Sequence, residues 1–179
     1  MNTDIRSSES IAYLDLTERF PLDDNTFDYV FSEHVIEHIQ YAQGVGMLRE
    51  AFRVLRPGGK IRVVTPDFVF LKALYDPEKS ALQKAYIAWA SEQWLGGSAP
   101  PYAEMHVINN YFRNWGHQFI YDQPSLTGAL ETAGFICIKR CKLNESDDQI
   151  FSGLEIETRM PAGFLRLESM VLEAVKGAP

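Results

Sequence analysis

Three side chains capable of acid–base chemistry follow a short apolar segment. Ser32, Glu33 and His34 come directly after the mostly apolar run at residues 27–31. Such a run is typical of a buried parallel strand. Ligands bind at the edge of a sheet where the carboxyl ends of parallel strands meet. We therefore expect these side chains to contact a ligand, and His34 is a candidate for proton transfer because imidazoles titrate near neutral pH.

A possible metal-binding pattern overlaps these residues. His34, Glu37 and His38 form the sequence H-x-x-E-H, which is the motif of inverted zinc proteases. Two imidazoles and one carboxylate suit zinc or another transition ion better than magnesium. The helical domain that such a protease needs is not indicated around the motif. We favour a hydrogen-bonding pair of Glu37 and His38 at the start of a helix, and we assign no metal ligand.

The elements that would position these residues form a β-α-β unit. After the first strand, apolar residues recur at the three- and four-residue spacing of one helix face: Met47, Leu48, Ala51, Phe52 and Leu55. Pro57-Gly58-Gly59 cannot continue this helix and permits a tight reversal. Residues 61–64 then predict a second strand, closed by Pro66. A β-α-β unit predicts a parallel sheet.

The rest of the chain also alternates between strands and helices. Strands are expected at residues 11–16, 135–143 and 169–175, with a possible further strand at 154–158. A helix is expected at residues 68–75. Another is expected to run to Gly96, with Asp76 as its N-cap and Pro77 in its first position. A loop at residues 96–101 follows, and a helix at residues 124–132 ends at Gly134.

An aromatic segment between these helices carries a further candidate. Residues 106–121 combine five aromatic side chains with several amides, and His117 lies among them. The segment could form a lid or a stacking platform for a substrate. Packing of the aromatic rings against the sheet explains the pattern equally well, so both interpretations stay open for His117.

Composition limits the classes of partner. The 179 residues are 46% hydrophobic, which is enough for one domain with a core, and the net charge is −7. A protein-wide basic footprint for nucleic acid is therefore absent. Cys137 and Cys141 do not indicate a disulfide framework. The first ten residues lack the apolar core of a signal peptide, and no run is long enough to span a membrane, so we expect a cytoplasmic protein.

The order of several short motifs resembles the class I S-adenosylmethionine-dependent methyltransferases, of the methyltransferase type 11 kind. The matching pieces are Asp15, the Phe20-Pro21-Leu22 turn, the strand at 27–30, and the segment at 48–59 that ends in Arg56-Pro57-Gly58-Gly59. The resemblance implies an α/β, Rossmann-like methyltransferase fold, truncated at the N-terminus, with a mostly parallel sheet and an antiparallel last strand. It implies a single domain over residues 1–179, with a helical and aromatic insertion at about 68–121.

The resemblance also implies a cofactor and roles for particular residues. S-adenosylmethionine would be the cofactor and a small molecule the methyl acceptor. Asp15 and Leu16 match the positions that meet the adenine, and Asp4 the position that binds the ribose. Ser32 and Glu33 match positions near the methionine end of the cofactor, and His34 and His117 are the candidate catalytic residues. The Gly-rich turn of the family is missing, because no G-x-G sequence precedes Asp15.

The missing turn leaves other interpretations open. The chain could be a catalytically inactive methyltransferase-like protein that acts by association, or an incomplete version of a longer protein. Without the first two strands of the family, one edge of the strand that begins at Phe27 lacks a neighbour. An unpaired edge invites pairing with another chain. We therefore expect either a homo-oligomer that covers this edge, or a strand at residues 11–16 that has moved beside Phe27.

Overall fold

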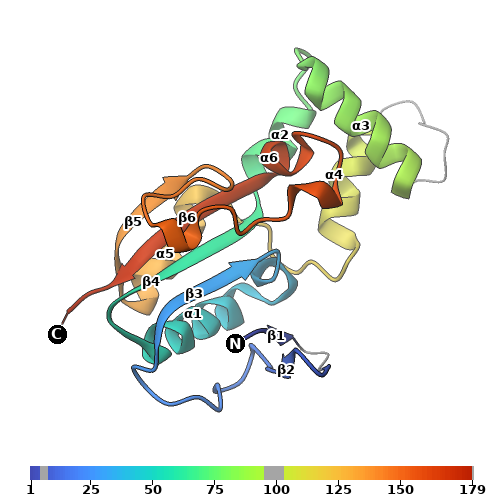
Figure 1. Ribbon diagram of the computed structural model, residues 1–179. Coiled ribbons are helices and arrows are strands. Elements are labelled where there is room, and N and C mark those ends of the chain that lie inside the picture. Colours follow the sequence, from blue (N-terminus) through green and yellow to red (C-terminus); the bar gives the residue numbers. More distant parts are fainter. Residues whose placement is uncertain (5–7, 95–102, 179) are drawn as a thin grey trace.

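A four-stranded sheet forms the centre of the molecule. The structure is a computed structural model that describes residues 1–4, 8–94 and 103–178. The strands lie in the order β3 (Phe27–Glu33), β4 (Leu55–Pro66), β6 (Ser169–Lys176) and β5 (Phe135–Cys141). Strand β3 is parallel to β4, and β6 runs antiparallel to both β4 and β5. The last strand therefore opposes the other three, as the resemblance implied (Figure 1).

The predicted β-α-β unit is present, with one local difference. Helix α1 (Tyr41–Val54) joins β3 to β4. The expected reversal at Pro57-Gly58-Gly59 lies inside β4 instead. Leu55 already pairs with Phe27, and the next pair joins Lys60 to Tyr29, so the residues between them form an irregularity in the ladder. Gly58 allows it because its φ of 80° is in the left-handed region that favours glycine.

Two helices cover one face of the sheet. Helix α5 (Gln123–Ala133) packs beside α1, and it ends at Gly134 with a φ of 105°, as expected for a glycine C-cap. The main core lies between these helices and the inward side chains of the sheet, including Leu48, Ala51, Leu126, Leu130, Ile61, Val63 and Leu172. This layer holds the carboxyl ends of β3 and β4 in place.

The opposite face of the sheet carries a buried charged group. Side chains alternate along a strand, so Arg62 on β4 points away from the core that contains Ile61 and Val63. It is fully buried and bonds to Glu155 and Glu173, both at 2.6 Å. The segment between β5 and β6 contains two short 3-10 helices, η2 (Gln149–Phe151) and η3 (Glu157–Arg159). The strand expected at residues 154–158 is therefore wrong.

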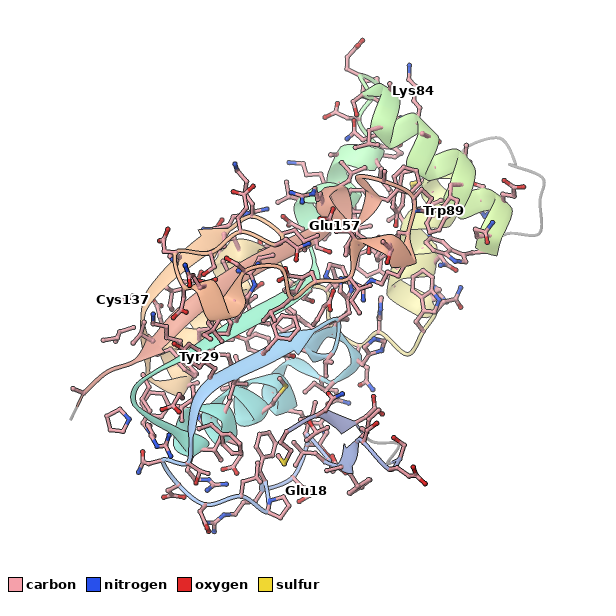
Figure 2. All side chains as sticks on the ribbon, in the orientation of Figure 1. Glu18, Tyr29, Lys84, Trp89, Cys137 and Glu157 are labelled. Atoms are coloured by element: carbon pink, nitrogen blue, oxygen red, sulfur yellow. The ribbon has the colours of Figure 1, made fainter. Side chains whose placement is uncertain are left out.

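Four helices form a second cluster at one end of the sheet. They are α2 (Phe68–Leu74), α3 (Ala81–Trp94), α4 (Ala103–Arg113) and α6 (Phe164–Glu168), and Figure 1 shows α3 as the outermost of them. Figure 2 places Trp89 on α3, facing the other members of this aromatic cluster. The predicted start of α3 at Asp76 is wrong. Ser80 and Gln83 exchange the hydrogen bonds of a capping box, so the helix begins after Ser80.

The N-terminal segment pairs with itself. Strand β1 (Thr3–Asp4) lies parallel to β2 (Ala12–Tyr13), and this pair is separate from the four-stranded sheet, on its β3 side (Figure 1). The expectation that the strand at 11–16 moves beside Phe27 is therefore wrong. Among the described residues, no strand pairs with the outer edge of β3. The loop expected at residues 96–101 lies outside the described residues.

Candidate functional site

The polar residues that follow the apolar run lie at the carboxyl end of β3, as predicted. The His34 N–H donates to the carbonyl oxygen of Val64 at 2.8 Å, so the end of β3 is held against β4. Ser32 is buried, and Glu33 and His34 are partly buried. The parallel strands thus bring three polar side chains to one edge of the sheet, which is where ligands bind in sheets of this kind.

Two of these side chains have oxygens without a hydrogen-bond partner. Ser32 Oγ and Glu33 Oε1 are buried and form no hydrogen bond. A guanidinium nitrogen of Arg159 lies 3.0 Å from Glu33 Oε1, which makes an ion pair without a directed hydrogen bond. Burial raises the pKa of the Glu33 carboxyl, and Arg159 partly offsets this effect. Unpaired buried polar atoms cost free energy, so they indicate a place where a polar ligand fits.

His34 has contacts on both ring nitrogens. Its Nε2 lies 3.1 Å from Ser169 Oγ at the start of β6, and its Nδ1 lies 3.4 Å from Glu37 Oε1. Its backbone φ of 49° is in the left-handed region, which is uncommon for a residue other than glycine. The side chain therefore ties the end of β3 to its neighbours. Its predicted catalytic role stays a prediction.

Glu37 and His38 lie on a short 3-10 helix, η1 (Ile36–His38), which precedes α1. The favoured hydrogen-bonding pair is wrong, because 3.9 Å separates His38 Nε2 from Glu37 Oε1. The carboxylate instead accepts a hydrogen bond from Thr65 Oγ1 at 3.0 Å through Oε2. Glu37 is fully buried, and its Oε1 has no hydrogen-bond partner. Burial opposes its ionisation, but His34 and His38 outweigh that effect and lower the pKa of the carboxyl.

His117 lies beside these residues although it is distant in sequence. The backbone N–H groups of Gln118 and Phe119 donate to the carbonyl oxygen of Glu37 at 2.8 and 3.2 Å. The loop after α4 therefore returns to η1, and the rings of His38 and His117 come within 4.7 Å of each other, centroid to centroid. Sequence reasoning selected His117 but could not place it near Glu37.

The three predicted residues of the N-terminal segment lie outside this cluster. Asp4 is an exposed residue of β1. Asp15 follows β2, and its carboxylate accepts hydrogen bonds from the backbone N–H and hydroxyl of Thr17 at 2.9 and 2.7 Å. These bonds lower the pKa of the Asp15 carboxyl. Leu16 packs against the main core. A hollow of about 270 Å³ lies beside Asp15, lined also by Tyr13, Leu14, Glu18, Arg19 and Pro21.

A comparison with known protein families finds a match for the N-terminal third of the chain. Residues 6–63, which contain β3, α1 and most of β4, match the model of a methyltransferase domain. This match covers about a third of the chain, and over these residues the chain is similar to methyltransferase domains. No curated protein matches the chain at a significant level.

Solved structures share the fold of this chain. A SAM-dependent methyltransferase from Archaeoglobus fulgidus has a TM-score of 0.56 at 14% identity, over 97% of this chain and 74% of its own. A second, from Mesorhizobium loti, has a TM-score of 0.53 at 15% identity, over 95% and 71%. A possible exported protein from Bordetella parapertussis has a TM-score of 0.53 at 14% identity, over 94% of this chain but 45% of its own length. These similarities show the fold.

The residues at the end of β3 fit part of S-adenosylmethionine. Ser32 Oγ and Glu33 Oε1, which form no hydrogen bond within the protein, suit the polar amino acid end of S-adenosylmethionine. Asp15, which was predicted to contact the adenine, is less available for this role, because its carboxylate already accepts two hydrogen bonds from Thr17. Residues 1–26 contain no glycine that could let the backbone approach the cofactor closely. The fit therefore rests on the end of β3.

Sequence reasoning missed two groups at this site. Arg159 reaches Glu33 from η3, and Thr65 reaches Glu37 from the end of β4. Thr65 had a signal, because it lies near the end of the strand that pairs with β3. Arg159 had none, because its position depends on how the segment between β5 and β6 folds back over the sheet. No helix in the described parts of the chain is long and apolar enough to cross a membrane.

Proposed function

We propose that the chain takes part in S-adenosylmethionine-dependent methyl transfer to a small-molecule acceptor, with the end of β3 as the cofactor-facing part of the site. The observation that carries this proposal is that the buried oxygens Ser32 Oγ and Glu33 Oε1 form no hydrogen bond within the protein, although Arg159 lies near the second as an ion pair. They lie on a strand within the matched family segment. A buried polar atom that lacks a partner in the protein is readily satisfied by a bound polar ligand.

Each residue has a task that follows from its chemistry. The Glu33 carboxylate would accept a hydrogen bond from the ammonium group of the cofactor, and the Ser32 hydroxyl would bond to another polar atom of the cofactor's amino acid end. The cofactor supplies an electrophilic methyl group, and the protein has to position the acceptor and relieve it of a proton. Of the two predicted acid–base residues, His117 has the freer ring. Burial lowers the pKa of His117, which favours the neutral imidazole that can accept a proton.

Calorimetry with S-adenosylhomocysteine tests the proposal. We expect saturable binding with one site per chain. Glu33→Gln should weaken binding about 10- to 100-fold, since a hydrogen bond to a charged group contributes about 1.5–3 kcal/mol. Ser32→Ala should weaken it up to about tenfold. Asp28→Asn is the matched control, because Asp28 is exposed at the other end of β3 and pairs with Arg56.

Two outcomes would count against this proposal. Folded wild-type protein that gives no heat of binding at millimolar ligand would exclude a cofactor site in this chain. Binding that all three variants retain equally would show that the ligand contacts another part of the surface. Circular dichroism of each variant confirms that the fold is intact.

The open edge of β3 favours a second candidate function. Among the described residues, no strand covers this edge. We propose as the alternative a catalytically inactive, methyltransferase-like protein that associates through β3, with a second copy of the chain as the partner. Sedimentation of the purified protein distinguishes the two functions when it is combined with the calorimetry. An oligomer that binds no S-adenosylhomocysteine would support the alternative.

The cellular setting belongs to the same proposal. Both cysteines are free thiols, which suits a reducing compartment such as the cytoplasm. The net charge of −7 favours a small-molecule substrate over nucleic acid. Fractionation of cells that express the untagged protein would test the location.

A further inference from the structure

A buried carboxylate oxygen faces two imidazoles that come from different parts of the chain. Glu37, His38 and His117 each offer one ligand atom, and these atoms lie within 4.8 Å of one another. Glu37 Oε1 is completely buried, lies within 4 Å of His34 Nδ1 and His38 Nε2, and forms no hydrogen bond. A buried charged atom that lacks a directed partner is costly. A cation between the carboxylate and the imidazoles would remove this cost.

The surroundings of the carboxylate hold it in place. Glu37 Oε2 accepts the hydrogen bond from Thr65 Oγ1, so only Oε1 is left for another partner. The carbonyl oxygen of Glu37 accepts hydrogen bonds from two backbone N–H groups of the loop that carries His117. Metal ligands in proteins are commonly oriented by such outer hydrogen bonds. Here the bonds fix the oxygen and the loop relative to each other.

His117 is oriented as a metal ligand would be. Its Nδ1 lies 2.7 Å from the carbonyl oxygen of Tyr111. A carbonyl oxygen only accepts hydrogen bonds, so Nδ1 must carry the hydrogen in the neutral ring, and Nε2 keeps a free lone pair. A histidine that donates its other N–H to a backbone carbonyl is the usual arrangement at metal sites.

We propose that Glu37, His38 and His117 bind one divalent transition-metal ion, preferably zinc. Two imidazole nitrogens and one carboxylate oxygen form a donor set suited to zinc and poorly suited to magnesium. Three protein ligands leave a fourth position for water or for an oxygen of a bound molecule. The predicted motif named His34 as a ligand, whereas the structure directs its Nε2 to Ser169 and supplies His117 instead.

The ion would draw the three ligand atoms together. Bonds of about 2.0–2.1 Å place neighbouring ligands of a tetrahedral zinc ion roughly 3.3 Å apart. At present the three ligand atoms lie within 4.8 Å of one another. His38 is the ligand that can move, because 38% of its side chain is exposed, whereas Glu37 is enclosed. This inference does not rest on methyl transfer, although bound zinc would occupy the Nε2 atom that could otherwise accept a proton.

Zinc titration of untagged protein tests the site. The full chain is treated with a chelator, dialysed, and titrated with Zn²⁺ in competition with a chromophoric chelator. We expect one ion per chain and a rise in Tm on binding, because a ligand of the folded state stabilises it. His38→Ala and His117→Ala should each weaken binding at least tenfold and abolish the rise in Tm. Mg²⁺ at the same concentration should not compete.

The matched control is another histidine outside the cluster. His106 is exposed on α4, so His106→Ala should bind zinc as the wild type does. Glu37→Gln keeps the size of the side chain and removes its charge, and it should weaken binding without unfolding the protein. The proposal is overturned if the wild type binds no zinc. It is also overturned if His117→Ala, folded by circular dichroism, binds zinc as tightly as the wild type.

Discussion

His34 and Ser169 join the end of β3 to the start of β6, through a contact of 3.1 Å between Nε2 and Oγ. The two strands are not neighbours in the sheet, because β4 lies between them. The side chain of His34 therefore spans the edge where the candidate site is formed. Its unusual backbone conformation aims it there, with a φ of 49°.

Two substitutions of His34 distinguish the effect of backbone strain on stability from the effect of losing the imidazole. His34→Val should lower the stability by about 1–3 kcal/mol, since a β-branched residue is strained in the left-handed region. His34→Asn should cost less, because asparagine tolerates this region. Thermal unfolding measures both, with roughly 2–4 °C of Tm per kcal/mol for a chain of this size. Equal losses in the two variants would contradict a backbone origin.

The buried ion pair of Arg62 and Glu155 should dominate the stability of the outer layer. Both side chains are fully buried, so Glu155→Ala leaves an incompletely compensated charge and should cost about 3–5 kcal/mol. Asp147→Ala is the control, since 95% of the Asp147 side chain is exposed in its pair with Lys139. Its cost should stay within about 1 kcal/mol. Urea unfolding gives both values, and similar losses for the two variants would disprove this account.

Acid should weaken the contact between α1 and the loop before β3. Arg53 is the main cause of the lowered pKa of Glu50, which also accepts the backbone N–H of Phe20. A lowered pKa means that the stabilisation is complete above the ordinary value of 4.5 and is lost as the pH falls through the folded-state value. The Tm difference between wild type and Glu50→Gln should therefore be largest near pH 7 and shrink below about pH 5. A constant difference from pH 7 to pH 3.5 would contradict this linkage.

The open edge of β3 can be blocked without disturbing the sheet. His34 donates its N–H to β4, so the alternation of a parallel ladder turns the N–H of Phe31 outward. Proline is tolerated at such an outward position. If copies pair through β3, Phe31→Pro should yield a monomer while Phe31→Ala stays associated, as measured by sedimentation. Association that persists in folded Phe31→Pro would place the contact elsewhere.

Local patterns were enough to predict the centre of the fold. The strand at Phe27, helix α1 and the strand that closes at Pro66 follow from apolar spacing within short windows. The position of Ser32 at the end of β3 follows from the same pattern. Asp76 was a plausible N-cap, but Ser80 and Gln83 together satisfy more backbone groups, so α3 begins later. Glycine-rich residues 57–59 stay in β4 because Leu55 already pairs with Phe27.

Contacts between distant parts of the chain were beyond such patterns. His117 reaches Glu37 only because the loop after α4 bonds to the backbone of η1. Arg159 reaches Glu33 across the sheet. Asp15 is a different case, because its hydrogen bonds to Thr17, two residues later, are those of a local turn. That signal was present in the sequence and favoured a capping role.

Hydrogen exchange with and without S-adenosylhomocysteine tests the central claim most directly, because it locates a bound ligand on the chain. We expect saturating ligand to slow the exchange of backbone amides in peptides that contain residues 30–38, since Ser32 and Glu33 would contact the ligand. Peptides from α3 should exchange at an unchanged rate. Slower exchange confined to other segments, or unchanged exchange throughout, would contradict a cofactor site at the end of β3.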